Sequence, residues 1–302
     1  MSSPIKNVAV VGGSGNLGRA AVDELLNAGF TVTALTREGS TATFPTNVAR
    51  KEVDYSSAES LVSALEGQDA VVSTIATVAV GGQKPLVDAA VAAGVKRFIP
   101  SEFGINTRFL GKQPIGSILQ GKIQTLNYIH EKSKQNPSFS WTGISTGLFF
   151  DWGLEYGSIG FNAKDRIAAI YDSGDEPFQA SNLPLIGKAI AAVLQHPERT
   201  ANRYISIASF NPTQNQILAI VEKLTGTRWS YSYLPVSEQQ EIGVEKLGRG
   251  DYSAFSNFLK KRIFEDGAGL AVEGPDNALA LLGLEGEDLE ASLKAWLEKE
   301  KK

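Results

Sequence analysis

The chain has 302 residues, enough for one large α/β body or for two lobes that share a cleft. Its formal net charge of -4 argues against a nucleic-acid surface, which needs clustered lysine and arginine. The absence of cysteine excludes disulfides, thiolate catalysis and cysteine-ligated metals. The two histidines, His130 and His196, are far apart in the sequence, so we expect no metal site.

No segment of the sequence is typical of a membrane span or a secretory signal. No apolar run reaches the roughly 18 residues that a membrane helix requires. Residues 1–6 lack the apolar core of a secretory signal and lead directly into a predicted strand. We therefore expect a cytoplasmic protein, a monomer or homodimer, whose partner is a small-molecule substrate and neither a nucleic acid nor a membrane.

In the first half of the chain, short apolar runs alternate with amphipathic stretches. Continuous apolar runs are typical of parallel strands that are covered on both faces. The alternation predicts an α/β fold with a doubly wound parallel Rossmann sheet, whose ligands bind beyond the carboxyl ends of the strands. The predicted strands cover residues 8–11, 31–36, 70–75 and 97–100, with a weaker apolar stretch near Val53, and the predicted helices cover 15–27, 57–65 and 83–93.

The second half of the chain is less regular and predicts a smaller C-terminal substrate-binding lobe. We expect a Rossmann domain at 1–150 and the lobe at 151–302, with residues 180–210 returning to the Rossmann body. The stretch 161–178 has mixed polarity and is interpreted as a flexible flap, and the acidic stretch 283–288 as a linker. The predicted strands cover 141–148 and 203–208, and the predicted helices cover 120–133, 185–195, 213–224, 251–264 and 289–300.

A glycine-rich loop follows the first strand and opens the first helix. In this context the GxGxxG spacing is a strong indication of dinucleotide binding, because glycines allow a tight turn and a close approach of backbone N–H groups to a diphosphate. The helix N-terminus adds partial positive charge. The loop residues predicted to bind the cofactor are Gly12, Gly13, Ser14, Gly15, Asn16, Leu17 and Gly18.

The end of the second strand indicates which nicotinamide cofactor is bound. An Asp or Glu at this place usually bonds the ribose of NAD, but here Thr36 is followed by Arg37, and a guanidinium favours a 2′-phosphate. We therefore predict NADP(H), while Glu38 leaves NAD as an alternative. Asp54 is interpreted either as a partner of the adenine amine or as a residue at a helix start. The loop after the third predicted strand is expected to pass over the cofactor with Thr74, Ile75 and Ala76.

Several segments together resemble a known family. They are the glycine loop, Thr36-Arg37-Glu38, the run KRFIPSEFG at 96–104, Lys122, and residues 142–149. The chain is similar to the isoflavone reductase and phenylcoumaran benzylic ether reductase group, the NmrA-like branch of atypical short-chain dehydrogenases. The resemblance covers residues 5–225 and is weak after about 230. It implies an NADPH-dependent reductase in which Lys122 contacts the cofactor and acts as general acid or base, with Phe103 beside the cofactor.

A second pair of residues competes with Lys122 for the catalytic role. Typical short-chain dehydrogenases use a YxxxK pair, but Ile118 stands four residues before Lys122 where the tyrosine is expected. Tyr128 and Lys132 do have this spacing. The family pattern places Tyr128 further along the helix, so Lys122 is the preferred candidate and the Tyr128–Lys132 pair remains an alternative.

Aromatic residues follow the predicted strand ends and suggest a substrate pocket. They either accept an aromatic ligand or simply form core between the lobes. The pocket residues predicted in this way are Phe103, Phe149, Phe150 and Trp152.

Three functions are compatible with these patterns. The preferred one is reduction of a small, aromatic or phenylpropanoid-like molecule by NADPH. A non-catalytic NADP(H)-binding redox sensor of the NmrA type is the alternative, although such regulators tend to lack the helix lysine that is present here as Lys122. A nucleotide-sugar epimerase or dehydratase is disfavoured because the in-register tyrosine is missing.

Overall fold

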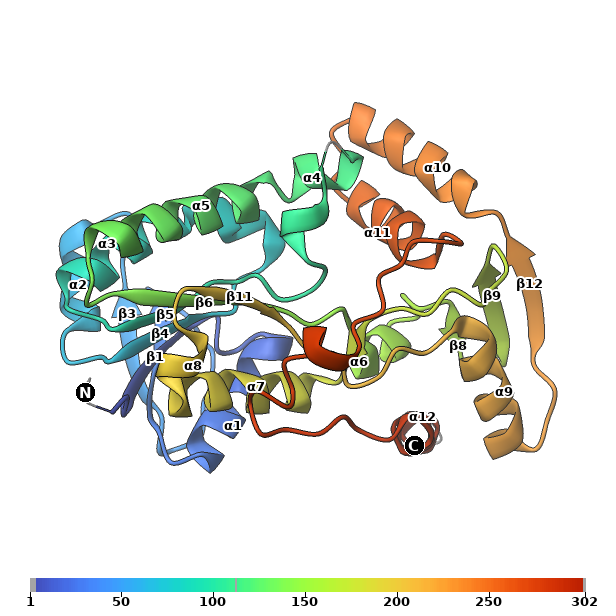
Figure 1. Cartoon of the computed structure of the whole chain (residues 1–302), viewed down its shortest axis with the longest axis horizontal. Coiled ribbons are helices and arrows are strands. Elements are labelled where there is room, and N and C mark those ends of the chain that lie inside the picture. Colours follow the sequence, from blue (N-terminus) through green and yellow to red (C-terminus); the bar gives the residue numbers. More distant parts are fainter. Residues whose placement is uncertain (1–3, 112, 301–302) are drawn as a thin grey trace.

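The centre of the molecule is a parallel β-sheet with helices on both faces (Figure 1). The computed structural model describes residues 4–111 and 113–300. Within these residues the central sheet has seven strands in the order β11-β6-β5-β4-β1-β2-β3. The prediction of a doubly wound α/β fold is thereby confirmed. The strands are β1 (Asn7–Val11), β2 (Thr31–Arg37), β3 (Ala49–Val53), β4 (Ala70–Ser73), β5 (Arg97–Ile99), β6 (Ser140–Ser145) and β11 (Arg203–Ser206).

Two hydrophobic cores hold the helices against the sheet. On one face α1 (Asn16–Asn27) and α7 (Leu183–Gln195) pack on the strands, followed by the short α8 (Pro197–Thr200). Other helices cover the opposite face of the sheet (Figure 1). They are α2 (Ala58–Leu65), α3 (Lys84–Ala92) and α5 (Gln120–Gln135). Because both faces are covered, the inner strands are buried along nearly their whole length.

Strand β3 was not predicted, although its last residue, Val53, had been noted as apolar. Its residues are mostly exposed and charged, and only Val53 is buried. It lies at the edge of the sheet and pairs with β2 alone. An edge strand that faces solvent does not need the apolar run by which the inner strands were recognised.

The predicted flap at 161–178 is wrong, because this segment forms two strands and part of a hydrophobic core. Strand β8 (Phe161–Asn162) pairs antiparallel with β9 (Ile167–Tyr171), and β12 (Ser230–Leu234) pairs parallel with β9. Phe161, Ile170 and Phe178 are at most 1% exposed. Mixed polarity here reflects strands with one buried side. Polar substitutions at these positions would therefore disrupt the hydrophobic core.

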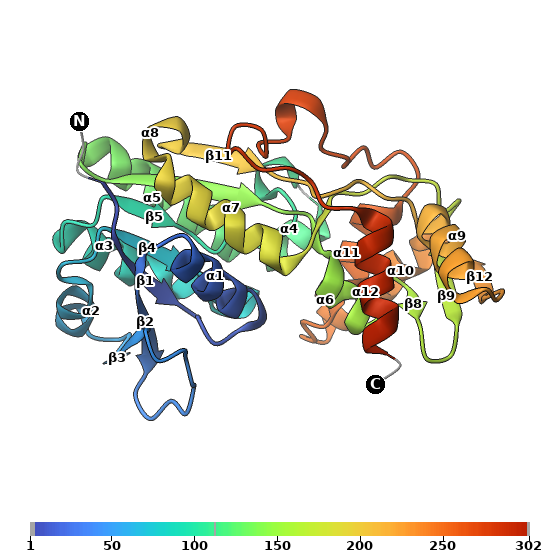
Figure 2. The ribbon, with the colours of Figure 1, turned by 90° about the horizontal axis from the view of Figure 1, so that it is seen from below.

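Helices complete the C-terminal lobe around this small sheet (Figure 2). Its core also contains Trp229, Leu293 and Trp296. The short α4 (Pro114–Ile118) and α11 pack on each other through a separate apolar cluster. The helices of the lobe are α6 (Phe150–Glu155), α9 (Gln214–Thr225), α10 (Val236–Gly248), α11 (Ala254–Phe264) and α12 (Leu289–Lys299).

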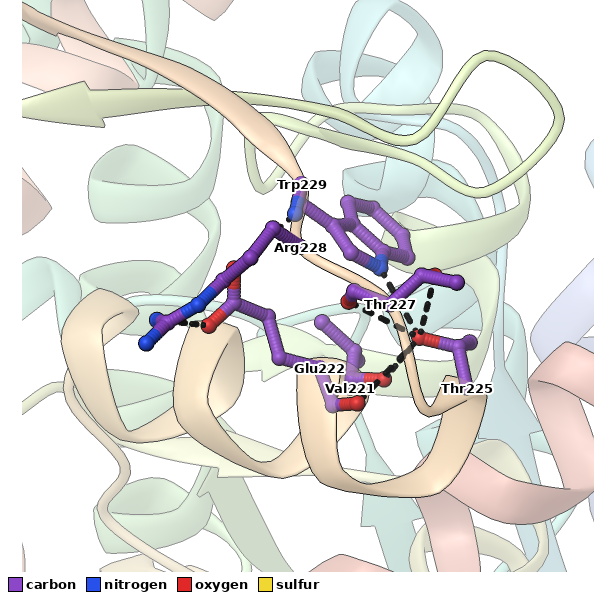
Figure 3. A network of polar contacts seen from close by, with 6 residues as sticks. All are labelled: Val221, Glu222, Thr225, Thr227, Arg228 and Trp229. Carbon is purple, nitrogen blue, oxygen red and sulfur yellow. Dashed lines mark hydrogen bonds and ion pairs between the residues drawn. The ribbon is translucent and has the colours of Figure 1, made fainter.

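The turn between α9 and β12 is fixed by a network of polar contacts (Figure 3). The Glu222 carboxylate accepts hydrogen bonds from the backbone N–H of Trp229 at 2.9 Å and from Arg228 Nη1 at 2.8 Å. The Thr225 hydroxyl donates to the carbonyl of Val221 at 2.7 Å and accepts from the Trp229 indole N–H at 3.3 Å. These contacts satisfy the polar atom of a tryptophan that is only 3% exposed.

Several shorter elements complete the fold. Strands β7 (Leu148–Phe149) and β10 (Ala180–Ser181) form a two-stranded parallel pair. The short 3-10 helices are η1 (Thr77–Gln83), η2 (Thr107–Phe109) and η3 (Gly274–Asp276). Among the described residues, no helix combines the length and apolar character needed to cross a bilayer.

The close contact between α1 and α7 leads to a testable prediction. A Cβ atom at Gly187 would lie 2.5 Å from the backbone oxygen of Ala20, so Gly187→Ala must push the two helices apart. We expect the free energy of unfolding to fall by about 1–3 kcal/mol, measured by urea denaturation. The control is Gly248→Ala, since a Cβ at Gly248 in α10 meets no atom within 4 Å. It should be neutral or stabilising by up to about 1 kcal/mol, and equal effects of the two substitutions would contradict the prediction.

Candidate active site

The predicted cofactor segments meet at one edge of the central sheet. Val11 of β1 is in register with Leu35 of β2 and with Ser73 of β4, and Val72 is in register with Ile99 of β5. The loops that follow these four strands therefore start side by side. The glycine loop, Arg37, the 74–76 loop and the 100–104 segment are brought together as the strand-end rule requires.

The glycine loop is so tightly folded that side chains are excluded at two positions. Gly12 has φ +80°, and a Cβ there would lie 3.0 Å from the backbone of Thr74. A Cβ at Gly18 would lie 2.1 Å from the carbonyl oxygen of Gly12. Helix α1 begins without a side-chain cap at Gly15, so its first N–H groups are left for another acceptor. This uncapped start suits a diphosphate group.

A second candidate cofactor-binding region includes the end of β2 and a hollow beside the glycine loop. Thr36 is buried, whereas Arg37 is exposed at the last position of the strand. A hollow of about 250 Å³ is lined by Gly13, Arg19 and the 43–45 loop. Arg50 of β3 donates from Nε to the Thr36 hydroxyl at 3.3 Å and from Nη2 to the Ser40 carbonyl at 2.5 Å. Sequence reasoning missed Arg50 because β3 itself was missed.

Asp54 belongs to the start of α2. Its carboxylate accepts from the N–H of Ser56 at 2.9 Å and from the Ser56 hydroxyl at 2.6 Å. These hydrogen bonds hold the pKa of Asp54 below its usual value. The helix-start interpretation therefore accounts for this residue.

The loops after β4 and β5 are tied to each other and to β1. The Thr74 hydroxyl donates to the carbonyl of Val11 at 3.0 Å, and the Ser101 hydroxyl donates to the carbonyl of Ile75 at 2.7 Å. The backbone N–H of Ser101 donates a hydrogen bond to the side-chain oxygen of the buried Gln83 at 3.3 Å. The segment that carries Glu102 and Phe103 is thus held in a fixed position.

Lys122 is buried and contacts the segment that carries Glu102 and Phe103. It lies in the first turn of α5, is 6% exposed, and its Nζ donates to the carbonyl of Phe103 at 2.9 Å. Burial lowers the pKa of Lys122, and the nearby charge of Glu102 opposes that shift. The ammonium group of such a lysine is a stronger acid than that of a lysine exposed to solvent.

Glu102 is a buried carboxyl group whose charge acts on Lys122 without a direct ion pair between the two, and its role was not anticipated from the sequence. It is 1% exposed, and burial raises its pKa while the charge of Lys122 and two hydrogen bonds lower it. Its Oε2 accepts from the hydroxyl of Thr107 at 2.5 Å and from that of Tyr204 at 3.2 Å. Tyr204 comes from β11, and burial raises its pKa, so the phenol stays protonated as a donor. The sequence offered no signal for this contact across 102 positions of the chain.

The alternative pair, Tyr128 and Lys132, is engaged on the outside of α5. The Tyr128 hydroxyl contacts both carboxylate oxygens of Asp88 on α3, at 2.6 and 2.7 Å. Lys132 Nζ lies 2.5 Å from the same carboxylate. The three groups form a partly exposed cluster between two helices, whereas Lys122 faces the end of β5.

The four predicted pocket residues have different surroundings. Phe103 is 6% exposed and packs in the sheet core, while Phe149 and Trp152 are half-buried. Phe150 is fully buried and packs against Phe210 with ring centroids 4.7 Å apart. The prediction that Phe150 lines the pocket is therefore wrong, because the first turn of α6 directs this ring into the lobe core. Phe149 and Trp152 keep part of their surface exposed.

The model of the NmrA-like family matches residues 4–259. Oxidoreductase aprR of Aspergillus flavus is 38% identical over 246 residues, which cover 80% of this chain and 82% of that protein. Oxidoreductase poxI of Penicillium oxalicum is 33% identical over 263 residues, which cover 87% and 83%.

Solved structures show the same fold. The binary complex of leucoanthocyanidin reductase and NADPH from Vitis vinifera superposes with a TM-score of 0.82. The alignment covers 97% of this chain and 99% of that one, with 19% identity.

The buried Glu102–Lys122 pair leads to a matched stability test. Glu102→Gln keeps the shape of the side chain but leaves the Lys122 ammonium without an opposite charge. We expect a loss of about 3 kcal/mol in the free energy of unfolding. Asp88→Asn makes the same change in the partly exposed cluster and should cost less than about 1 kcal/mol. Urea denaturation of both variants at neutral pH checks this, and an equal cost would show that the two buried charges are not coupled.

Proposed function

The chain belongs to the NmrA-like family, and we propose that it is an NADPH-dependent reductase of a small, aromatic or phenylpropanoid-like molecule in which Lys122 is the general acid or base. The proposal rests on Lys122 of α5, which is buried against the segment that follows β5. The charge of Glu102 raises the pKa of Lys122, against the effect of burial. A regulator that only binds a dinucleotide has no need of an ammonium group buried at this cost.

The glycine loop and Arg37 are proposed to hold the cofactor. The uncapped start of α1 takes the diphosphate, and the exposed guanidinium of Arg37 takes the 2′-phosphate. The relatives named oxidoreductases and the NADPH complex of a protein with the same fold support this assignment. When bound, NADPH supplies a hydride.

Lys122 is proposed to move the proton that accompanies reduction. Its Nζ is anchored by one hydrogen bond to the Phe103 carbonyl, which leaves two N–H groups for other acceptors. Its lowered pKa makes the ammonium group a stronger acid than that of a solvated lysine. Glu102 moderates that lowering, and Thr107 and Tyr204 hold Glu102 in place.

The substrate is proposed to lie against the aromatic side chains at the same edge. Phe149 and Trp152 are only half-buried, and Phe103 packs in the sheet core directly after β5. Flat aromatic molecules gain both apolar burial and ring contacts against such a surface.

The catalytic assignment is tested by comparing two variants in NADPH oxidation with a panel of aromatic enones, benzylic ethers and quinones. Lys122→Met removes the proton donor and should lower kcat by at least about 100-fold, whereas Tyr128→Phe should stay within about twofold of the wild type. NADPH binding, followed by its fluorescence, should persist in both. Full turnover in Lys122→Met, or loss of turnover in Tyr128→Phe, would refute the assignment. Tight NADPH binding by the wild type without turnover of any compound would favour the redox sensor.

The choice of cofactor is tested at the end of β2. Arg37→Ser should raise the Kd for NADPH by at least about tenfold, since a charge-assisted contact to the 2′-phosphate is lost. The Kd for NADH should change little. The control, Glu38→Gln, should leave NADPH affinity intact. A loss of NADH affinity in Glu38→Gln, with no effect of Arg37→Ser on NADPH, would indicate NAD instead.

A further inference from the structure

A second cavity, of about 670 Å³, lies along the edge strand β11. The glycine loop, Arg37, the 74–76 loop and Lys122 take no part in its lining. Its walls come from β11, from the 105–109 loop and from the segment that follows α11. That segment, which we call the strap (residues 267–281), passes beside β11 in both views of the ribbon (Figures 1 and 2). The volume lies in the range of small-molecule sites.

The strap is fastened to the rest of the protein at two asparagines. Asn277 Nδ2 donates to the carbonyl of Ala208 at 2.8 Å, and its Oδ1 accepts from the N–H of the same residue at 3.2 Å. Asn211 makes the corresponding pair of hydrogen bonds with the backbone of Val272, at 3.0 and 2.9 Å. Between these two fasteners η3 spans the cavity. The cavity is therefore a built feature and not a gap beneath a loose segment.

Three arginines give the lining a positive charge. Arg108, Arg203 and Arg262 all line the cavity, against a single acidic lining residue, Asp276. No ion pair joins any of the three arginines to a carboxylate within the described ranges 4–111 and 113–300. This is a local excess of positive charge in a protein whose net charge is -4. Such an excess favours an anion.

Two of these arginines have features of a prepared anion site. The guanidinium of Arg108 lies 4.4 Å from the ring centroid of Tyr204 and 5.4 Å from that of Phe109, so both rings orient it. Arg262 has a buried Nε without a hydrogen-bond partner among the described residues. Burial lowers the pKa of Arg262, partly offset by the charge of Glu265. This Nε is itself out of reach of a ligand in the cavity, so Arg262 would meet an anion through the part of its side chain that lines the cavity.

The remainder of the cavity lining is largely apolar. The side chains near the arginines include Ile105, Phe178, Ile263, Leu270 and Leu281. A small inorganic ion would leave this surface in contact with water. A molecule with an apolar body and one anionic end matches both parts of the lining.

We propose that this cavity binds a small organic carboxylate, with its carboxylate on Arg262 and Arg108 and its apolar body against the strap. The site is separate from the proposed cofactor and substrate site and does not depend on the proposed function. Tyr204 forms a shared wall, since its ring lines the cavity while its hydroxyl bonds Glu102.

The experiment uses 1-naphthoate as the probe and isothermal titration calorimetry on the full chain, with and without saturating NADPH. Saturable binding is expected in both conditions, and the neutral isostere 1-naphthamide should bind at least about tenfold more weakly because it lacks the charge. Arg262→Gln and Arg108→Gln should each raise the Kd for 1-naphthoate by about tenfold. The control is Arg249→Gln just after α10, an exposed arginine outside the cavity, which should leave the Kd unchanged.

Several outcomes would overturn the proposal. They are displacement of 1-naphthoate by NADPH, equal affinity for the amide, an unchanged Kd in both cavity variants, and no saturable binding up to about 5 mM, the weak end of specific affinities. Thermal unfolding of each variant shows whether a lost affinity reflects lost structure. If one arginine variant is unstable, the other still decides, since both are predicted to act on the same carboxylate. None of these results depends on turnover, so failure here is distinct from failure of the reductase assignment.

Discussion

The burial of two opposite charges between β5 and α5 is the constraint on which the candidate site depends. Glu102 and Lys122 are both removed from water, and each offsets part of the desolvation cost of the other. Holding them requires a fixed 101–107 segment, which Ser101, Thr107 and Tyr204 provide through hydrogen bonds. The pair therefore links the sheet, helix α5 and the edge strand β11. The ammonium group of Lys122 is held in place by its hydrogen bond to the Phe103 carbonyl.

The parallel sheet supplies the second part of the site. Because β1, β2, β4 and β5 run in the same direction and in register, four loops begin at one edge. Backbone contacts at Gly12 and Gly18 leave no room for side chains, so helix α1 starts close against the β4 loop. The uncapped start of that helix and the exposed Arg37 both lie at this edge of the sheet. The anion recognition proposed for this region would follow from backbone geometry more than from any single side chain.

The C-terminal lobe encloses the other end of the molecule and makes two different surfaces. Helix α11 packs on α4 near the beginning of α5 through Phe258, Ile115 and Leu110. The strap that follows α11 returns along β11 and closes the arginine-lined cavity there. The same stretch of chain thus covers both the neighbourhood of Lys122 and a separate cavity. Tyr204 belongs to both, with its hydroxyl on Glu102 and its ring on the cavity side.

The sequence by itself determined the doubly wound fold, the glycine loop and the family, because buried strands and tight turns leave local patterns of apolar residues and glycines. It also brought Arg37 into view through its place after a strand, and Lys122 through the resemblance to a known family. It missed β3 and misjudged 161–178, since an exposed edge strand and a half-buried hairpin lack such patterns. Only the tertiary structure decided that Phe150 is core, that Tyr128 bonds Asp88, and that Glu102 meets Tyr204. These outcomes depend on contacts between residues far apart in the chain, which no local pattern records.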